Sequence, residues 1–163
     1  MIILLLDMNR KVVYNACYGG FNLSPRAKKM LYEKKHPGET VYFYKEVYED
    51  GVGSHTYLKV DEKDLDSCDT FNLHCVSLDF GKEITFEYES IEGKRFNDHY
   101  VWNTNIERHD PDLISIVEEL GTEKASGKCA RLKVKDIGEE HYHINDYDGY
   151  ESVITSLGDD YWK

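Results

Sequence analysis

The chain has 163 residues and a formal net charge of −11, from 20 basic and 31 acidic side chains. Such an acidic balance argues against general binding to DNA, RNA or an anionic membrane. The length suits one domain, the hydrophobic share of 40% is enough for a core, and no apolar run is long enough to span a membrane.

The first forty residues predict two strands followed by a helix. The apolar segments 2–7 and 11–18 are rich in strand-forming residues and flank a turn. The first segment lacks the basic start and the long apolar centre of a signal peptide. Ser24 and Pro25 mark a helix start, because serine can cap free amides and proline at the first helical position loses no hydrogen bond. Residues 36–39 end this helix.

The middle of the chain predicts mainly strands. Residues 40–48 and 55–60 are strand candidates that pair as a hairpin across a glycine-containing turn. Residues 71–89 predict two more strands around a turn, and the acidic run 61–69 predicts an exposed loop or a short helix. We therefore expect a strand-rich insertion over residues 40–100, between two halves of a core domain.

The last third of the chain contains the clearest helix. Over residues 109–121 apolar side chains recur at helical spacing, and Gly121 stands where a left-handed cap is expected. Residues 122–128 predict a loop and 129–137 an alternating strand. Residues 141–154 predict a further strand and an Asp-Gly turn.

These elements predict an α+β fold with mainly antiparallel strands and two principal helices, because strands occur in series and the helices lie far apart in the sequence. We expect a single compact domain over residues 1–163. The four cysteines show no CxxC spacing, which favours free thiols in a cytoplasmic protein.

The sequence NACYGGFNLSPRAKK, residues 15–29, combines features that suit an anionic ligand. Glycines allow positive φ and a close approach of the backbone to a ligand. A helix N-terminus presents free amides and partial positive charge, and the flanking aromatic rings can stack on a base. The first forty residues also carry seven basic side chains against three acidic ones. The candidate ligand-binding residues are Tyr18, Gly19, Gly20, Phe21, Ser24 and Arg26. A purely structural interpretation stays open, since a tight turn into a capped helix needs the same residues.

Arg108 and Asp110 are two further candidate ligand-binding residues, because they stand at the start of the second predicted helix. Arg108 could reach a phosphate bound at the N-terminus of that helix. The alternative is an ion pair between Arg108 and Asp110 or Asp112, or a purely structural cap.

Catalytic and metal-binding signals are weak in this sequence. His141 and His143 alternate on a predicted strand. A metal site that adds His99, His109 or an aspartate is conceivable, but spacing fixes no third ligand. Cys17 beside the glycines is either an activated thiol or a small buried residue. Recognised hydrolase motifs are missing from the sequence, so we expect a protein that is not an enzyme and has no catalytic residue, resident metal or cofactor.

Four blocks of the sequence resemble, in the same order, a widespread family of small phage-encoded proteins. The blocks are NACYGGFNLS, RHDPDLISIVEELG, ASGKCARLKVKDI and INDYDGYESV. The family shows CYGGF-x-LS, R-x-DPDL-x-x-VVEELG, a small-residue loop with A-x-LK-V, and a closing YDG-x-E. The blocks cover about a third of the chain, and residues 40–100 match no part of that pattern.

The resemblance extends to viral sponges that capture the cyclic oligonucleotides of bacterial anti-phage signalling (CBASS) without cleaving them. It implies a cyclic di- or trinucleotide ligand, a homo-oligomer as the working form, and the cytoplasm of an infected host cell as the location. It also implies ligand contacts from the Tyr18–Phe21 block and the Ser24 helix start, followed by Arg108. Two other interpretations stay open: an acidic decoy that inhibits a basic host protein, and an enzyme that degrades a nucleotide.

Overall fold

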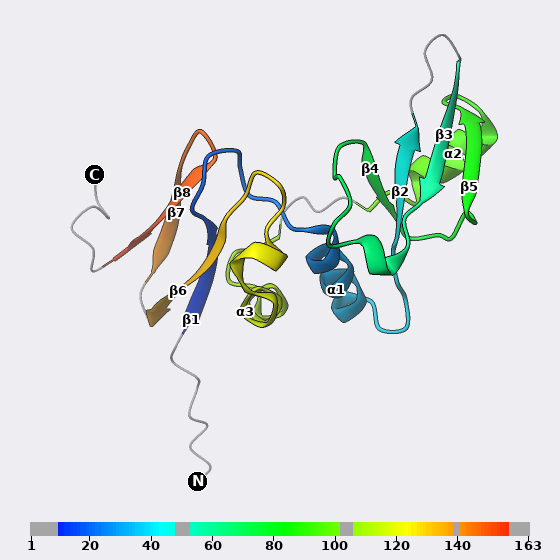
Figure 1. Cartoon of the computed structure of the whole chain (residues 1–163). Helices are drawn as coiled ribbons and strands as arrows, with labels where there is room; N and C mark the ends of the chain where they lie inside the picture. The colour runs from blue at the N-terminus through cyan, green and yellow to red at the C-terminus, as the bar shows by residue number, and fades with distance from the viewer. Residues whose placement is uncertain (1–9, 48–52, 102–105, 139–140, 157–163) are drawn as a thin grey trace. The chain divides into compact units, whose positions relative to one another are not determined.

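The computed structural model describes residues 10–47, 53–101, 106–138 and 141–156. Its α-helices and mostly antiparallel strands confirm the predicted α+β class (Figure 1). The chain divides into two compact units. The first unit comprises Met1–Ala27 and Asn105–Lys163, and the second unit comprises Lys28–Thr104. The second unit thus lies between two segments of the first in chain order, as an insertion would, while a single domain over 1–163 stays a prediction.

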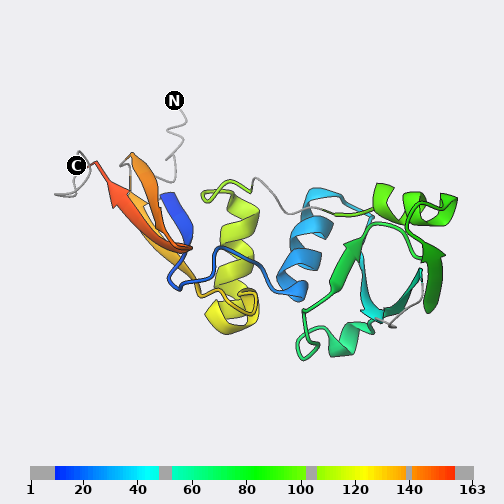
Figure 2. The ribbon, with the colours of Figure 1, turned by 90° about the horizontal axis from the view of Figure 1, so that it is seen from above.

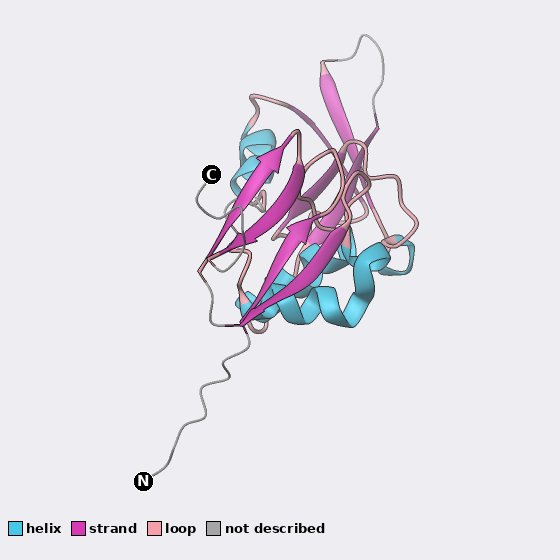
Figure 3. Cartoon of the chain, turned by 90° about the vertical axis from the view of Figure 1, so that its left-hand side faces the viewer, coloured by secondary structure: helices cyan, strands magenta, loops and turns pink. Residues whose placement is uncertain are grey.

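The strands of the first unit form two antiparallel pairs. Strand β1 (Arg10–Asn15) pairs with β6 (Leu132–Gly138), and β7 (Tyr142–Tyr147) forms a hairpin with β8 (Tyr150–Thr155). The four strands run alongside one another in Figure 3. Alternation in the sequence explains the core, because the inward side chains of successive strands pack together. They are Val12, Ile137 and Val153, with Tyr14, Tyr142 and Ile144 around them.

The predicted boundaries of these strands hold only in part. The segment 2–7 lies outside the described residues. The strand expected over 11–18 ends at Asn15, and the one expected over 129–137 begins at Leu132. Residues 141–154 form two strands rather than one, because the Asp-Gly turn, with Asp148 and Gly149 both at positive φ, folds the chain back on itself.

Helix α3 (Pro111–Ala125) packs against β1 and β6 in the first unit. Its buried side chains include Leu113, Ile116 and Val117, which belong to the predicted apolar stripe. Gly121 has the expected positive φ, at 76°, but its ψ of 167° kinks the helix there, and the C-cap is Ser126 instead. The loop expected over 122–128 begins later than predicted, because the helix makes one more turn and ends at Ala125.

The second unit contains a four-stranded antiparallel sheet in the order β4-β2-β3-β5. The strands are β2 (Tyr42–Val47), β3 (Ser54–Lys59), β4 (Leu73–Val76) and β5 (Glu83–Glu87). The predicted hairpin is confirmed, since β2 pairs with β3. The two strands expected over 71–89 both exist, but β4 pairs with β2 and β5 with β3, so they lie at opposite edges of the sheet.

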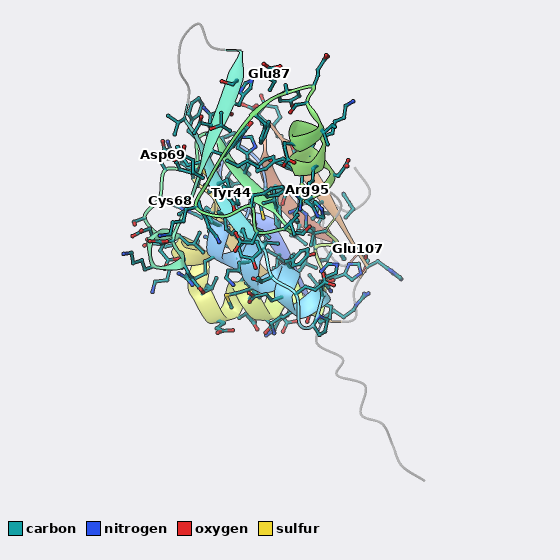
Figure 4. All side chains as sticks on the ribbon, turned by 90° about the vertical axis from the view of Figure 1, so that its right-hand side faces the viewer. Tyr44, Cys68, Asp69, Glu87, Arg95 and Glu107 are labelled. Atoms are coloured by element: carbon teal, nitrogen blue, oxygen red, sulfur yellow. The ribbon has the colours of Figure 1, made fainter. Side chains whose placement is uncertain are left out.

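The Tyr44 hydroxyl fixes the connection that runs from β4 to β5. It accepts a hydrogen bond from the Phe80 backbone amide at 2.8 Å and donates one to the Gly81 carbonyl at 2.8 Å. Tyr44 is fully buried and lies toward the middle of the side chains of this unit in Figure 4. Burial raises its pKa to about 12, so the phenol keeps the proton that it donates.

Two helices cover the faces of this sheet (Figure 2). Helix α2 (Ile91–Asp98) places Phe96 against one face, and α1 (Pro25–Lys35) places Tyr32 against the other. The helix over residues 25–35 was predicted, whereas α2 adds a third helix to the two expected. A short 3-10 helix, Glu62–Asp64, stands in the acidic run. No helix in the described part of the chain is both long and apolar enough to cross a membrane.

Candidate functional site

The turn after β1 meets the turn between β7 and β8 in the first unit. The Gly19 amide faces the Asp148 carbonyl at 3.5 Å. A Cβ atom on Gly149 would lie only 2.2 Å from the Gly20 nitrogen. All three glycines have positive φ, of 116°, 90° and 82°. Glycine is therefore required here by backbone conformation and by the contact between the two turns.

The third sequence block reaches the same place. A Cβ atom on Gly19 would lie 2.7 Å from the carbonyl oxygen of Cys129. The close backbone approach predicted at the glycines is thus present, but it is an approach to other parts of the chain. Cys17, next to this turn, is a free, half-buried thiol.

Arg108 links the second sequence block to the first and the fourth. Its guanidinium carbon lies 3.4 Å from the centre of the Phe21 ring, and its Nη2 donates to Glu151 Oε1 at 2.5 Å. Its backbone carbonyl accepts a hydrogen bond from Val13. Burial lowers the pKa of Arg108, and the carboxylate of Glu151 opposes that shift. Within the described residues the buried Nη1 has no hydrogen-bond partner.

Asn15 and Glu151 are the two buried polar side chains of the described chain, and both organise this junction. The Asn15 amide donates to the carbonyls of Cys17 and Gly149, each at 2.7 Å, and its Oδ1 accepts from the Arg131 amide at 2.8 Å. Glu151 Oε2 accepts from the Asn15 backbone amide at 2.8 Å. Sequence reasoning missed both residues, although each stands inside one of the four blocks.

Three exposed tyrosines surround the junction, and we call them the tyrosine patch: Tyr18, Tyr147 and Tyr150. Their side chains are 61%, 76% and 39% exposed. The ring centres of Tyr18 and Tyr150 lie 5.4 Å apart at an angle of 47°. Tyr147 and Tyr150 are register partners on the hairpin, so they project from the same face of it. Large exposed rings are costly to leave in water, which makes this patch a candidate ligand surface.

The remaining predicted ligand residues have structural roles at helix ends or lie beside them. Ser24 caps α1, since its hydroxyl accepts from the Ala27 amide at 3.1 Å and donates to the Lys124 carbonyl at 2.6 Å. Asp110 caps α3 by accepting from the amides of the second and third helical residues. Arg26 is half-buried in the first turn of α1. The structure therefore brings together Tyr18, Gly19, Gly20, Phe21 and Arg108, with Ser24 and Asp110 as caps.

No protein-family model, curated protein or solved structure matches the chain. The resemblance of the four blocks to phage proteins therefore stays a prediction.

The histidines considered as metal ligands have other partners or lie at the surface. His109 bonds the Tyr142 hydroxyl at 2.6 Å and contacts Glu107 at 2.7 Å. His141 and His143 are exposed. Over the described ranges, no group of three or more His, Cys, Asp or Glu side chains is arranged to hold a metal ion.

The second unit holds a carboxylate between two imidazoles on the face of the sheet that α2 covers. Glu46 Oε1 lies 2.6 Å from His55 Nδ1, and Oε2 lies 3.3 Å from His74 Nε2. Tyr57 packs beside His74 with ring centres 5.1 Å apart. Burial lowers the pKa of His74, against the opposing influence of Glu46. Burial and Glu46 together raise the pKa of Tyr57 to about 12.

Proposed function

We propose that the protein binds a cyclic di- or trinucleotide messenger and sequesters it without cleaving it, as an immune-evasion protein of a phage. The observation that carries the proposal is the convergence of the four sequence blocks on one junction with an exposed tyrosine patch. Residues 15–21, Arg108, Cys129 and the 148–151 turn meet there, although they are distant in the sequence.

The tyrosine patch supplies the contact surface for the bases. Stacking of a base on an aromatic side chain contributes roughly 1–3 kcal/mol and tolerates any base. A cyclic oligonucleotide presents two or three bases from one compact ring, so several rings grouped on one face suit it. The junction beneath the patch is held by the buried side chains of Asn15 and Glu151, and this ordering reduces the entropy cost of holding the rings in place.

Sequestration needs tight binding rather than chemistry. A messenger at micromolar concentration is depleted only if Kd lies well below a micromolar, which corresponds to about −8 kcal/mol or better. The junction gathers phenols, glycine backbone and an arginine that is already paired with Glu151, beside the free thiol of Cys17 and the exposed carboxylate of Asp148. This set suits holding a ligand more than activating water or a nucleophile.

The test is isothermal titration of the whole chain with a panel of cyclic di- and trinucleotides, followed by chromatography of the ligand released on denaturation. We expect submicromolar binding to at least one of them and intact ligand after long incubation. Tyr18→Ala should weaken binding about tenfold or more, which is the loss of one stacked base. Tyr88→Ala is the matched control, because Tyr88 is 60% exposed but belongs to the second unit.

An absence of binding by every cyclic nucleotide would overturn the proposal, and release of altered ligand would replace it with the enzyme interpretation. Assembly into a homo-oligomer and location in the cytoplasm of an infected cell belong to the same proposal. Sedimentation of the ligand-bound protein tests the first of these. The acidic decoy of a basic host protein stays the alternative prediction if no nucleotide binds.

A further inference from the structure

The turn inside the tyrosine patch presents an exposed carboxylate. Asp148 stands between Tyr147 and Tyr150 in the register of the hairpin, with φ at 51°. Its backbone carbonyl faces the Gly19 amide at 3.5 Å, which ties the residue to the junction. Among the described residues no hydrogen bond or ion pair to its side chain is found, whereas Asp146 Oδ1 accepts from the Gly149 amide at 3.1 Å.

The charges around the patch disfavour direct phosphate contact. Arg108 is one cation of the junction, and its Nη2 is bonded to the buried Glu151. Its guanidinium face is covered by Phe21. The carboxylates of Asp146 and Asp148 would repel a phosphate brought to the tip of the hairpin. These contacts favour recognition of a nucleotide on this patch through a base, with its phosphates turned away.

We infer that the patch selects guanine: the base stacks on the Tyr18–Tyr150 pair while the Asp148 carboxylate accepts hydrogen bonds from its Watson–Crick edge. This inference rests on the proposed function. Guanine presents two neighbouring donors on that edge, N1–H and the N2 amino group, and one carboxylate can accept both. Adenine presents one donor, the N6 amino group, and one acceptor, N1, on that edge. The partial negative charge of N1 would face the carboxylate oxygen and be repelled by it. Hydrogen bonds to a charged group are strong enough to give roughly 10- to 100-fold discrimination.

The experiment compares cyclic di-GMP with cyclic di-AMP by isothermal titration against the whole chain. We expect at least tenfold tighter binding of cyclic di-GMP. Asp148→Asn removes one acceptor oxygen and the charge, so it should lose most of that preference. Asp146→Asn is the matched control, because it removes the same charge from the same hairpin and its amide oxygen can still accept from Gly149. Thermal melts of both variants verify that they fold.

The outcomes separate this inference from the proposed function. Equal binding of the two dinucleotides, or a preference for cyclic di-AMP, overturns guanine selection and leaves sequestration standing. An equal loss in Asp148→Asn and Asp146→Asn also overturns it, because the effect would then be one of charge alone. Failure of both dinucleotides and of every other cyclic nucleotide to bind overturns the proposed function and this inference with it.

Discussion

The guanidinium carbon of Arg108 lies 3.4 Å from the centre of the Phe21 ring, so the cation of one sequence block is covered by the aromatic residue of another. The same guanidinium is paired with Glu151, whose side chain is only 3% exposed. A cation held in this way is a structural element of the junction. It positions Phe21 and the β7–β8 hairpin, and the tyrosines of the patch lie on these two segments.

Removal of Glu151 should therefore destabilise the protein. In Glu151→Ala the buried Arg108 loses its counter-charge and the backbone amide of Asn15 loses its acceptor. We expect a loss of about 3–5 kcal/mol in the free energy of unfolding, measured by urea denaturation. Glu118→Ala is the control, because that carboxylate is paired with Lys11 but is 44% exposed, and its removal should cost less than about 1 kcal/mol. Equal effects of the two variants would contradict the structural role of Arg108.

Replacement of Gly149 by alanine should separate the junction's two turns. The new Cβ would lie 2.2 Å from the Gly20 nitrogen, which is backbone and cannot rotate away. We expect Gly149→Ala to cost more than Gly138→Ala, where φ is also positive, at 57°, but nothing lies within 4 Å of the added atom. Conformational strain alone costs of the order of 1–2 kcal/mol. Thermal unfolding of the two variants measures the difference, and equal melting temperatures would argue against contact between the turns.

The Tyr44 hydroxyl should stabilise the crossing from β4 to β5. In Tyr44→Phe the Phe80 amide and the Gly81 carbonyl both lose their partner. We expect a loss of about 1–3 kcal/mol, with faster amide hydrogen exchange at Phe80. Tyr42→Phe removes a hydroxyl from a half-buried ring of the same strand and should change stability little. An unaltered exchange rate at Phe80 in Tyr44→Phe would be inconsistent with this contact.

Stability should fall on mild acidification because of His74. Burial lowers its pKa in the folded state, so the unfolded chain, with a histidine pKa of about 6.5, binds more protons below neutral pH. The contribution of His74 to the free energy of unfolding is therefore full above about pH 6.5. It is lost as the pH falls from about 6.5 toward the lower pKa of the folded state. Urea denaturation between pH 7 and pH 5 should show a shallower slope for His74→Gln than for the parent.

The sequence predicted those helices and strands that are set by neighbouring residues, such as caps and turns. Ser24 and Pro25 begin α1, Asp110 begins α3, and the hairpin β2-β3 follows from two strand patterns around a turn. Helix α2 went unrecognised because its eight residues are mostly polar, and its Ser90 cap is its main signal. Strands β4 and β5 pair with β2 and β3 rather than with each other, which no local pattern reveals.

The sequence indicated several residues of the candidate site, but not how they are arranged or which buried residues hold them. Tyr18, Gly19, Gly20, Phe21 and Arg108 do lie together. Their partners Asn15 and Glu151 are separated by 136 positions, so only the folded chain shows that they meet. Ligand binding at the glycines stays a prediction, and the contact that the structure shows there is with the neighbouring turn, because the hairpin carries a glycine at the matching point.

The division of the first unit into two sequence segments has a consequence for synthesis. The second unit is contiguous and can complete its sheet as soon as its last residues leave the ribosome. Strand β1 must wait for β6, and the contact from Asn15 to Arg131 closes a loop of 116 positions. Contacts that distant form slowly. A nascent chain that stops after the second unit therefore displays an unpaired strand with Val12 and Val13, a surface prone to aggregation.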